Sequence, residues 1–266
     1  MSDAATILAA RLADTRLGPF DVRCPLEHFL MVTYAVDPAK LSPHYDGERF
    51  TLDLVETAEG PRALVSAVSF LDADFRFVLA PFAPMVFGQT NYRFYVKDRA
   101  TEEHAAWFIG TTLGHDVVHV ARALFKLPWH PAEYTFETGR SHDGRYHRFR
   151  QIVRSEWGPA FYDVEDTGAP LQLRDAPGYP DHDEMFLRLC HPVTGYFFRT
   201  DGGVARYSIW HEKLALRVAK PRALYIGLFD RLGLVREDEM MRPHSVLVAS
   251  KVLFHIHLPP RRLSET

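Results

Sequence analysis

The stretch Gln89-Thr90-Asn91-Tyr92-Arg93-Phe94-Tyr95-Val96-Lys97 decides how this chain of 266 residues is interpreted. Its odd positions are all polar or carry a polar tip, and its even positions from 92 onward are Tyr, Phe and Val. A period of two is typical of a β-strand with two unlike faces. The stretch also holds the single asparagine of the chain. We therefore expect a strand whose polar face is either solvated or lines a polar cavity.

Three features favour the cavity. The row uses amides and a tyrosine where outer faces usually carry Glu and Lys, it follows the apolar segment Pro81–Phe87, and a barrel has an interior face to fill. In a cavity, the Arg93 guanidinium would suit a carboxylate through paired hydrogen bonds. Lys97 shares that face, and a lysine in an apolar, cationic setting can form a Schiff base with a carbonyl compound. The alternative for Lys97 is a flanking residue at a strand end.

Composition limits the classes of protein open to this chain. Apolar residues make up 47% of it, enough for a sizeable core, and the formal net charge of −3 provides no basic field for nucleic acid. Two cysteines, Cys24 and Cys190, are too few for a disulfide framework and are expected to be reduced. No apolar run has the length of a membrane span, and the N-terminus lacks a signal-peptide core. We expect a cytoplasmic protein without nucleic-acid or membrane partners.

The remaining sequence is rich in predicted strands. Helices are expected at 3–16, 116–127 and 225–232, with a short one after Asp37. Strands are expected at 29–36, 50–56, 63–70, 75–79, 105–112, 146–155, 185–190, 196–200, 204–210 and 246–258. The Asp201-Gly202-Gly203 segment is a strong hairpin signal. No linker or repeat divides residues 1–266, so one domain is expected, and many antiparallel strands favour a closed β architecture without exposed edges.

Histidines supply two further candidate sites. His115 and His119 have the spacing of a metal-binding pair, but the polar stripe that they begin is more typical of a solvated helix face, so no metal is expected. His211 ends a predicted strand and precedes Glu212, whose carboxylate could orient the imidazole for proton transfer. A surface histidine at a hairpin end is the alternative. Signatures of serine hydrolases, P-loop proteins and Rossmann proteins do not occur.

Five segments, in order along the chain, resemble the acetoacetate decarboxylase-like superfamily. Met31–Leu41 resembles its opening strand and turn, and Phe87–Val96 resembles the central motif of one branch, domain of unknown function 2071. The segments that resemble the same branch elsewhere are Ala121–Trp129, Tyr207–His211 and Pro243–Leu247. The resemblance spans nearly the whole chain and implies an α+β fold around a mostly antiparallel, cone-shaped, closed β-barrel with an internal cavity and a few peripheral helices.

The resemblance also implies a chemistry. In decarboxylases of the superfamily, a cavity lysine in a Gly-x-Pro-Lys-Lys context forms a Schiff base with a β-keto acid. This chain lacks that context, Tyr95 falls near the position of the lysine, and Gln89 stands where Glu is usual.

We therefore predict that the cavity binds a small carboxylated or carbonyl-bearing molecule without a cofactor, with homo-oligomerisation left open. Arg93 is the candidate for anion recognition, and Gln89 and Asn91 are the candidate hydrogen-bonding partners. The candidate catalytic residues are Tyr95, His211 and Lys97. Decarboxylation, aldol-type or dehydration chemistry is the expected reaction, and a non-catalytic binding or sensing protein is the alternative.

Overall fold

The Gln89–Lys97 row lies within strand β5 (Met85–Asp98) of the computed structural model, which describes residues 3–263. Strand β5 pairs antiparallel with β4 (Gly60–Phe77) on one side and with β6 (His104–Leu113) on the other. Asn91 lies opposite Val68 on β4 and Thr111 on β6. The predicted strand is therefore confirmed, and it lies between two long neighbours inside the sheet.

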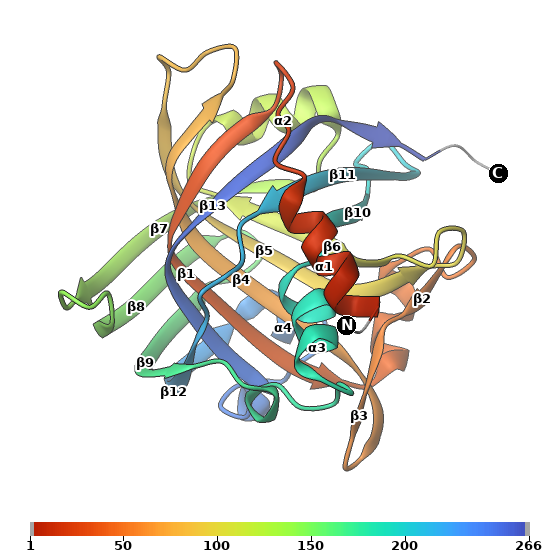
Figure 1. Ribbon diagram of the computed structural model, residues 1–266, viewed down its shortest axis with the longest axis vertical. Helices are drawn as coiled ribbons and strands as arrows, with labels where there is room; N and C mark the ends of the chain where they lie inside the picture. The colour runs from red at the N-terminus through yellow and green to blue at the C-terminus, as the bar shows by residue number, and fades with distance from the viewer. Residues whose placement is uncertain (1–2, 264–266) are drawn as a thin grey trace.

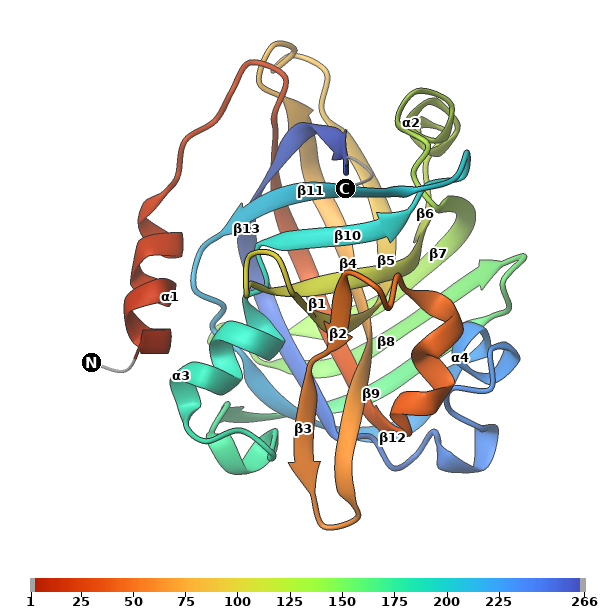
Figure 2. The same cartoon turned by 90° about the vertical axis from the view of Figure 1, so that its right-hand side faces the viewer.

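Most of the chain is in one sheet of 13 strands, with few helices (Figures 1 and 2). The other strands are β1 (Val22–Val36), β2 (Phe50–Leu52), β3 (Leu54–Thr57), β7 (Trp129–Arg140), β8 (Tyr146–Ser155), β9 (Ala160–Pro170), β10 (Thr194–Phe198), β11 (Val204–His211), β12 (Arg217–Ile226) and β13 (Ser245–Arg262). The α-helices are α1 (Asp3–Ala13), α2 (Val117–Phe125), α3 (His182–Met185) and α4 (Gly227–Arg231). Short 3-10 or π-helical segments are η1 (Pro38–His44), η2 (Leu173–Asp175), η3 (Phe186–Cys190) and η4 (Glu237–Glu239).

The prediction of a closed barrel is wrong, because the sheet is branched and contains parallel as well as antiparallel pairs. Strand β6 runs parallel to both β7 and β10, although most other pairings are antiparallel. The chain passes from β6 to β7 through helix α2, and a parallel pair needs such a crossover, since a tight hairpin can join only antiparallel strands. Strand β5 pairs with β2, β4 and β6, and β13 pairs with β1, β11 and β12, so the strands do not follow a single ring.

The two faces of β5 lie against separate apolar cores. Tyr92, Phe94 and Val96 pack in a core that includes side chains of β8, β9, β12 and α4. The opposite face, through Phe87 and Tyr95, contributes to a second core with side chains of α1, α2 and residues 185–190. Because both faces are covered, the polar row is not a solvated outer face.

Several predicted elements differ from the observed ones. The predicted strand at 185–190 is wrong, because the end of α3 and the π-helical turn η3 occupy it; the Asp181 side chain caps the start of α3 by accepting the Glu184 N–H at 2.8 Å. A short apolar run fits a buried helix and a buried strand equally well. The predicted strands at 63–70 and 75–79 are joined in the continuous β4, so that Asp72 lies inside a strand.

Other predictions are confirmed. Strands β10 and β11 form the hairpin that Asp201-Gly202-Gly203 indicates, with Phe198 opposite Val204. The helix predicted at 116–127 is α2, and the helix predicted at 3–16 ends at Ala13. Within residues 3–263, we find no helix with both the length and the apolar character needed to cross a bilayer.

Candidate functional site

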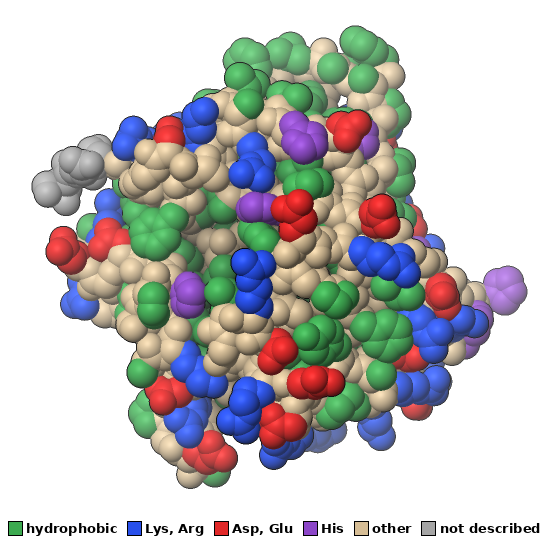
Figure 3. Space-filling view, turned by 180° about the vertical axis from the view of Figure 1, so that it is seen from behind, with side chains coloured by type: hydrophobic (Ala, Val, Ile, Leu, Met, Phe, Trp, Pro, Cys, Tyr) green, Lys and Arg blue, Asp and Glu red, His purple; other side chains and the backbone are tan. Residues whose placement is uncertain are grey.

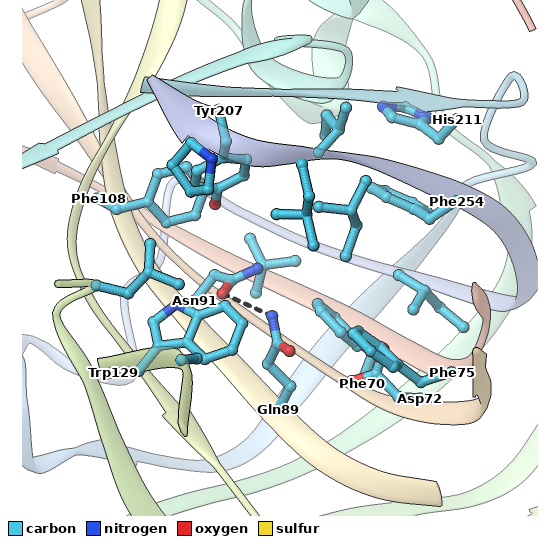
Figure 4. Close-up of a pocket in the computed structure, with 18 of the residues that line it drawn as sticks. Phe70, Asp72, Phe75, Gln89, Asn91, Phe108, Trp129, Tyr207, His211 and Phe254 are labelled. Carbon is cyan, nitrogen blue, oxygen red and sulfur yellow. Dashed lines mark hydrogen bonds between the residues drawn. The ribbon is translucent and has the colours of Figure 1, made fainter. Parts of the chain in front are cut away.

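A cavity of about 230 Å³ lies between β4 and β5 on one side and β11 and β13 on the other (Figure 4). Helix α2 forms one of its edges through Val117, Val120 and Leu124. Gln89, Asn91 and Arg93 line the cavity from β5, as the period-two pattern predicts for three neighbours on one strand face. Its volume lies just below the roughly 300–1,000 Å³ typical of ligand pockets, which favours a small molecule.

Hydrogen bonds fix the two amides of the row. The Asn91 Oδ1 atom accepts from Gln89 Nε2 at 3.0 Å and from the Thr111 hydroxyl at 2.8 Å (Figure 4 shows the first of these). Thr111 faces Asn91 across the β5–β6 pair, so the strand register places this contact. With its oxygen engaged twice, Asn91 has its amide N–H groups left to offer to a ligand, and Gln89 has its carbonyl oxygen.

Arg93 is a buried cation in an almost apolar setting. Only 8% of its surface is exposed, and no carboxylate of residues 3–263 forms an ion pair with it. Its Nη2 atom lies 3.4 Å from the Leu189 carbonyl oxygen and 3.7 Å from the Met31 sulfur, and the guanidinium lies 5.4 Å from the centre of the Tyr95 ring. These three contacts offset only a small part of the free-energy cost of burying a charge. The Nε atom has no hydrogen-bond partner among the described residues.

Tyr95 lies behind the cavity and is not part of its lining. The Tyr95 hydroxyl is 2.9 Å from the Ser66 hydroxyl, which is in turn 2.9 Å from the Thr33 hydroxyl, and all three side chains are buried. This chain of hydroxyls ties β5 to β4 and β1. Tyr95 therefore supports Arg93 from beneath, through its ring.

Lys97 also lies outside the cavity lining. Its ammonium group forms an ion pair with Glu102 in the turn that follows β5, and 36% of its side chain is exposed. Residue 97 is four positions beyond Arg93, a distance of about 13 Å along a strand, so the row is longer than the cavity it lines. The structure thus places Lys97 as a flanking residue near a strand end.

His211 does line the cavity, from the end of β11. Its Nδ1 atom donates to the Glu212 backbone carbonyl at 2.8 Å, so the imidazole is oriented by the backbone and not, as predicted, by the Glu212 carboxylate. That carboxylate accepts the Leu253 N–H at 2.8 Å instead. Burial, together with the neighbouring His191 at a ring-centre distance of 4.0 Å, lowers the pKa of His211 well below its ordinary value. The ring is therefore neutral, with Nε2 free as an acceptor.

Asp72 is a cavity residue that the sequence interpretation missed. It is 2% exposed, its Oδ1 atom accepts from the Cys24 sulfur at 2.9 Å, and its Oδ2 atom has no partner among the described residues. Burial raises the pKa of this carboxyl to about 7. The available signal was the alternation Val68, Phe70, Asp72, which puts the carboxyl on the same strand face as two apolar neighbours.

The remaining candidate groups are not gathered into a second centre. His115 and His119 are exposed on and beside α2. Across residues 3–263, no group of three or more His, Cys, Asp or Glu side chains is placed to hold a metal ion. Cys24 and Cys190 are buried and free, which confirms the prediction that they form no disulfide.

The strand order and the cavity define a protein with the fold of the acetoacetate decarboxylase-like enzymes. Acetoacetate decarboxylase from Legionella pneumophila has a similar structure, with a TM-score of 0.59 and 12% identity over 97% of this chain and 95% of that one. An acetoacetate decarboxylase-like enzyme from Sphingomonas wittichii RW1 is similar with a TM-score of 0.59 and 10% identity over 94% and 95% of the two chains. The enduracididine biosynthesis enzyme MppR, complexed with pyruvate, has a TM-score of 0.54 and 13% identity over 95% and 93%.

The sequence itself identifies the family. The model of domain of unknown function 2071, described as an uncharacterized conserved protein, matches residues 24–253. The chain belongs to this family, as its motifs indicated. Among curated proteins, none matches the sequence.

Proposed function

We propose that the cavity binds a small carboxylated or carbonyl-bearing molecule and that Arg93 holds its anionic group. The observation that carries this proposal is the burial of the Arg93 guanidinium beside the cavity without a carboxylate partner in residues 3–263. A buried charge is normally paired, since desolvation costs several kcal/mol per ion. A bound carboxylate would supply the missing partner, and the guanidinium can donate two parallel hydrogen bonds to it.

The amide pair and His211 give the remaining polar contacts in this proposal. Asn91 donates to a carbonyl or carboxylate oxygen through its free N–H groups, and the Thr111 contact holds it in that orientation. The neutral His211 ring accepts a hydrogen bond or a proton at Nε2, because Nδ1 is engaged with Glu212. Tyr95 serves as a positioning residue for Arg93.

The fold supports a reaction as the second part of the proposal. Enzymes with this fold include acetoacetate decarboxylases, and MppR has been complexed with pyruvate. For this chain we propose decarboxylation, aldol-type or dehydration chemistry on the bound molecule. In the aldol-type and dehydration reactions, His211 would accept the proton that is removed from carbon. Such a reaction would proceed without an amine from Lys97, which pairs with Glu102 outside the cavity lining.

A non-catalytic binding or sensing protein is the second candidate, and one observation favours it. None of the six lysines of the chain, all of which lie within residues 3–263, lines the cavity. The Schiff-base route of amine catalysis therefore has no amine in place. Incubation of the protein with pyruvate and with acetoacetate, followed by NMR, separates the two candidates, since an enzyme consumes a ligand that a sensor only binds.

Calorimetric titration tests the binding itself. Arg93→Met keeps an unbranched apolar side chain and removes its charge, and Arg16→Met is a matched control because the Arg16 side chain is 89% exposed and is not part of the lining of this cavity. We expect wild type and Arg16→Met to bind carboxylates alike, and Arg93→Met to bind them at least tenfold more weakly, as the loss of about 1.4 kcal/mol or more would produce. Equal binding by Arg93→Met would contradict the proposal.

A further inference from the structure

Building on the proposed function, we propose that the ligand carries its carboxylate on an apolar body, either an alkyl chain or an aromatic ring. A small keto acid that is polar throughout would leave most of this cavity unfilled. The inference names the class of ligand, whereas the proposed function concerns only its anionic group.

Most of the polar groups of the cavity lie along one strand. Arg93, Asn91 and Gln89 follow one another along β5, and His211 lies at the end of β11. Another part of the wall, here called the aromatic part, is built from the rings of Phe70 and Phe75 on β4 and Phe254 on β13 (Figure 4), together with Phe29 on β1. A ligand body that fills this part gains about 25 cal/mol for each Å² of apolar surface that it removes from water.

The one carboxyl in the aromatic part reports how apolar that part is. Asp72 lines the cavity beside Phe70 and Phe75, yet it is 2% exposed and hydrogen-bonded only to the Cys24 thiol. No Lys or Arg of residues 3–263 forms an ion pair with it. A site built for a second anion or for a strongly hydrated group would offer it a cation or a set of donors. This part of the cavity offers an unpaired carboxyl and phenyl rings.

The edge of the cavity is apolar as well. On α2, Val120 and Leu124 line the cavity while 55% and 68% of their surfaces are exposed, so they mark its opening to solvent. The loop between β4 and β5 lies at the same end of the molecule (Figures 1 and 2), and its Leu79 and Phe82 are 59% and 84% exposed. Hydrophobic side chains gather at this end in the space-filling view (Figure 3).

Such an apolar rim continues the chemistry of the cavity interior. Exposed apolar patches of a soluble surface commonly mark ligand-binding grooves. Here the residues at the opening are themselves part of the cavity lining, which joins the patch to the site. An apolar ligand body would therefore meet apolar side chains from the opening at α2 to the rings of β4.

A ligand series tests the inference by calorimetry with the full chain. The probes are acetate, butanoate and hexanoate, with pyruvate and phenylpyruvate as a matched pair of keto acids. We expect the affinity to rise about fourfold for each added methylene and to be at least tenfold higher for phenylpyruvate than for pyruvate. Acetate or pyruvate that bind as tightly as their apolar counterparts would overturn the inference.

A variant at the opening adds a second readout. Leu124→Ser removes an exposed apolar side chain, so the fold should be little affected, and Leu54→Ser, at a 37% exposed position of β3 outside the cavity, is its control. We expect Leu124→Ser to weaken hexanoate binding about threefold or more and to leave acetate binding unchanged. The same loss for both acids, or no loss for hexanoate, would count against entry and binding along α2.

The same titrations separate this inference from the proposed function. If short and long acids bind alike and both depend on Arg93, the proposed function stands and the inference fails. If apolar acids bind best but Arg93→Met binds them as tightly as wild type, the role of Arg93 fails and the apolar class of ligand stands.

Discussion

The Cys24 thiol donates a hydrogen bond of 2.9 Å to the Asp72 carboxyl, and this contact is buried at the aromatic part of the cavity wall. Cys24 lies on β1 and Asp72 on the neighbouring strand β4. The pairing of these strands shifts its register between Arg23 and Leu26 of β1, next to Cys24. The thiol is a weak donor. Its hydrogen bond therefore stabilises the ionised form of the Asp72 carboxyl only slightly.

Asp72 should make the stability of the fold depend on pH. Because burial raises its pKa from 3.8 to about 7, the folded state keeps the proton while the unfolded state has released it. The contribution of Asp72 to the free energy of unfolding is therefore fully present below about pH 4. It is lost as pH rises through about 7, by an amount on the order of 4 kcal/mol. Asp72→Asn cannot ionise, so we expect it to gain stability relative to wild type as pH rises.

Urea unfolding at several pH values between about 4 and 8 measures this difference. Asp74→Asn, two residues along β4, is the matched control, since Asp74 is partly exposed and pairs with Arg76. The control shows how much of the difference comes from replacing any aspartate of this part of β4. Parallel pH profiles for wild type and Asp72→Asn would show that the carboxyl has the same pKa in the folded state as in the unfolded state, and would contradict the prediction.

The histidine pair should act in the opposite direction. Burial, with a smaller contribution from the Arg11 charge, lowers the pKa of His191 from 6.5 to about 4. As pH falls from 6.5 to 4, the unfolded chain takes up a proton that the folded chain refuses, so stability falls by about 3 kcal/mol. His191→Phe should lose less stability over this interval. An unchanged acid sensitivity would argue that His191 is protonated in the fold.

Arg93 and Arg217 should respond oppositely to the same substitution. Arg217 forms an ion pair with the buried Asp166 at 2.8 Å, whereas Arg93 has no such partner in the described chain. Arg217→Met leaves a buried carboxylate unpaired and should cost about 3–5 kcal/mol. Arg93→Met removes an unpaired buried charge and should leave the unliganded protein equally stable or more stable.

Thermal and urea unfolding of the two variants measure this contrast. A gain in stability together with a loss of binding at Arg93 is the pattern expected of a residue kept for function. If Arg93→Met is as destabilised as Arg217→Met, the guanidinium has a structural role that the unliganded structure does not explain.

Borohydride reduction in the presence of acetoacetate should yield no covalent adduct at Lys97. The ammonium group of Lys97 pairs with Glu102, and the side chain lies outside the cavity lining. Mass spectrometry of the digested protein locates any reduced Schiff base, and Lys251, exposed on β13, reports non-specific labelling. An adduct at Lys97 well above the level at Lys251 would restore amine catalysis as the mechanism.

The sequence predicted the parts of the fold that have a clear local pattern. The alternation of Gln89, Asn91 and Arg93 placed all three on one face of β5, and β8 (Tyr146–Ser155) has the predicted bounds. Strands β7, β9 and β12 went unpredicted; Pro131 and Pro221 interrupt the patterns of β7 and β12. The parallel pairing of β6 was not accessible either, because it depends on where the chain returns after α2.

The site was predicted in part for similar reasons. A strand pattern gives the face on which Lys97 lies but not the point at which the cavity ends, and the cavity ends before Lys97. Asp72 falls between the two strands predicted at 63–70 and 75–79, and only the continuous β4 shows that it is buried. The contact between Cys24 and Asp72 joins residues 48 positions apart, so no local signal could reveal it.

A crystal structure of the protein with bound phenylpyruvate tests the central claim most directly. The account predicts the carboxylate within about 3 Å of the Arg93 guanidinium nitrogens, with the phenyl ring among Phe70, Phe75 and Phe254. A carboxylate bound away from Arg93, or a ligand seated outside this cavity, would contradict it.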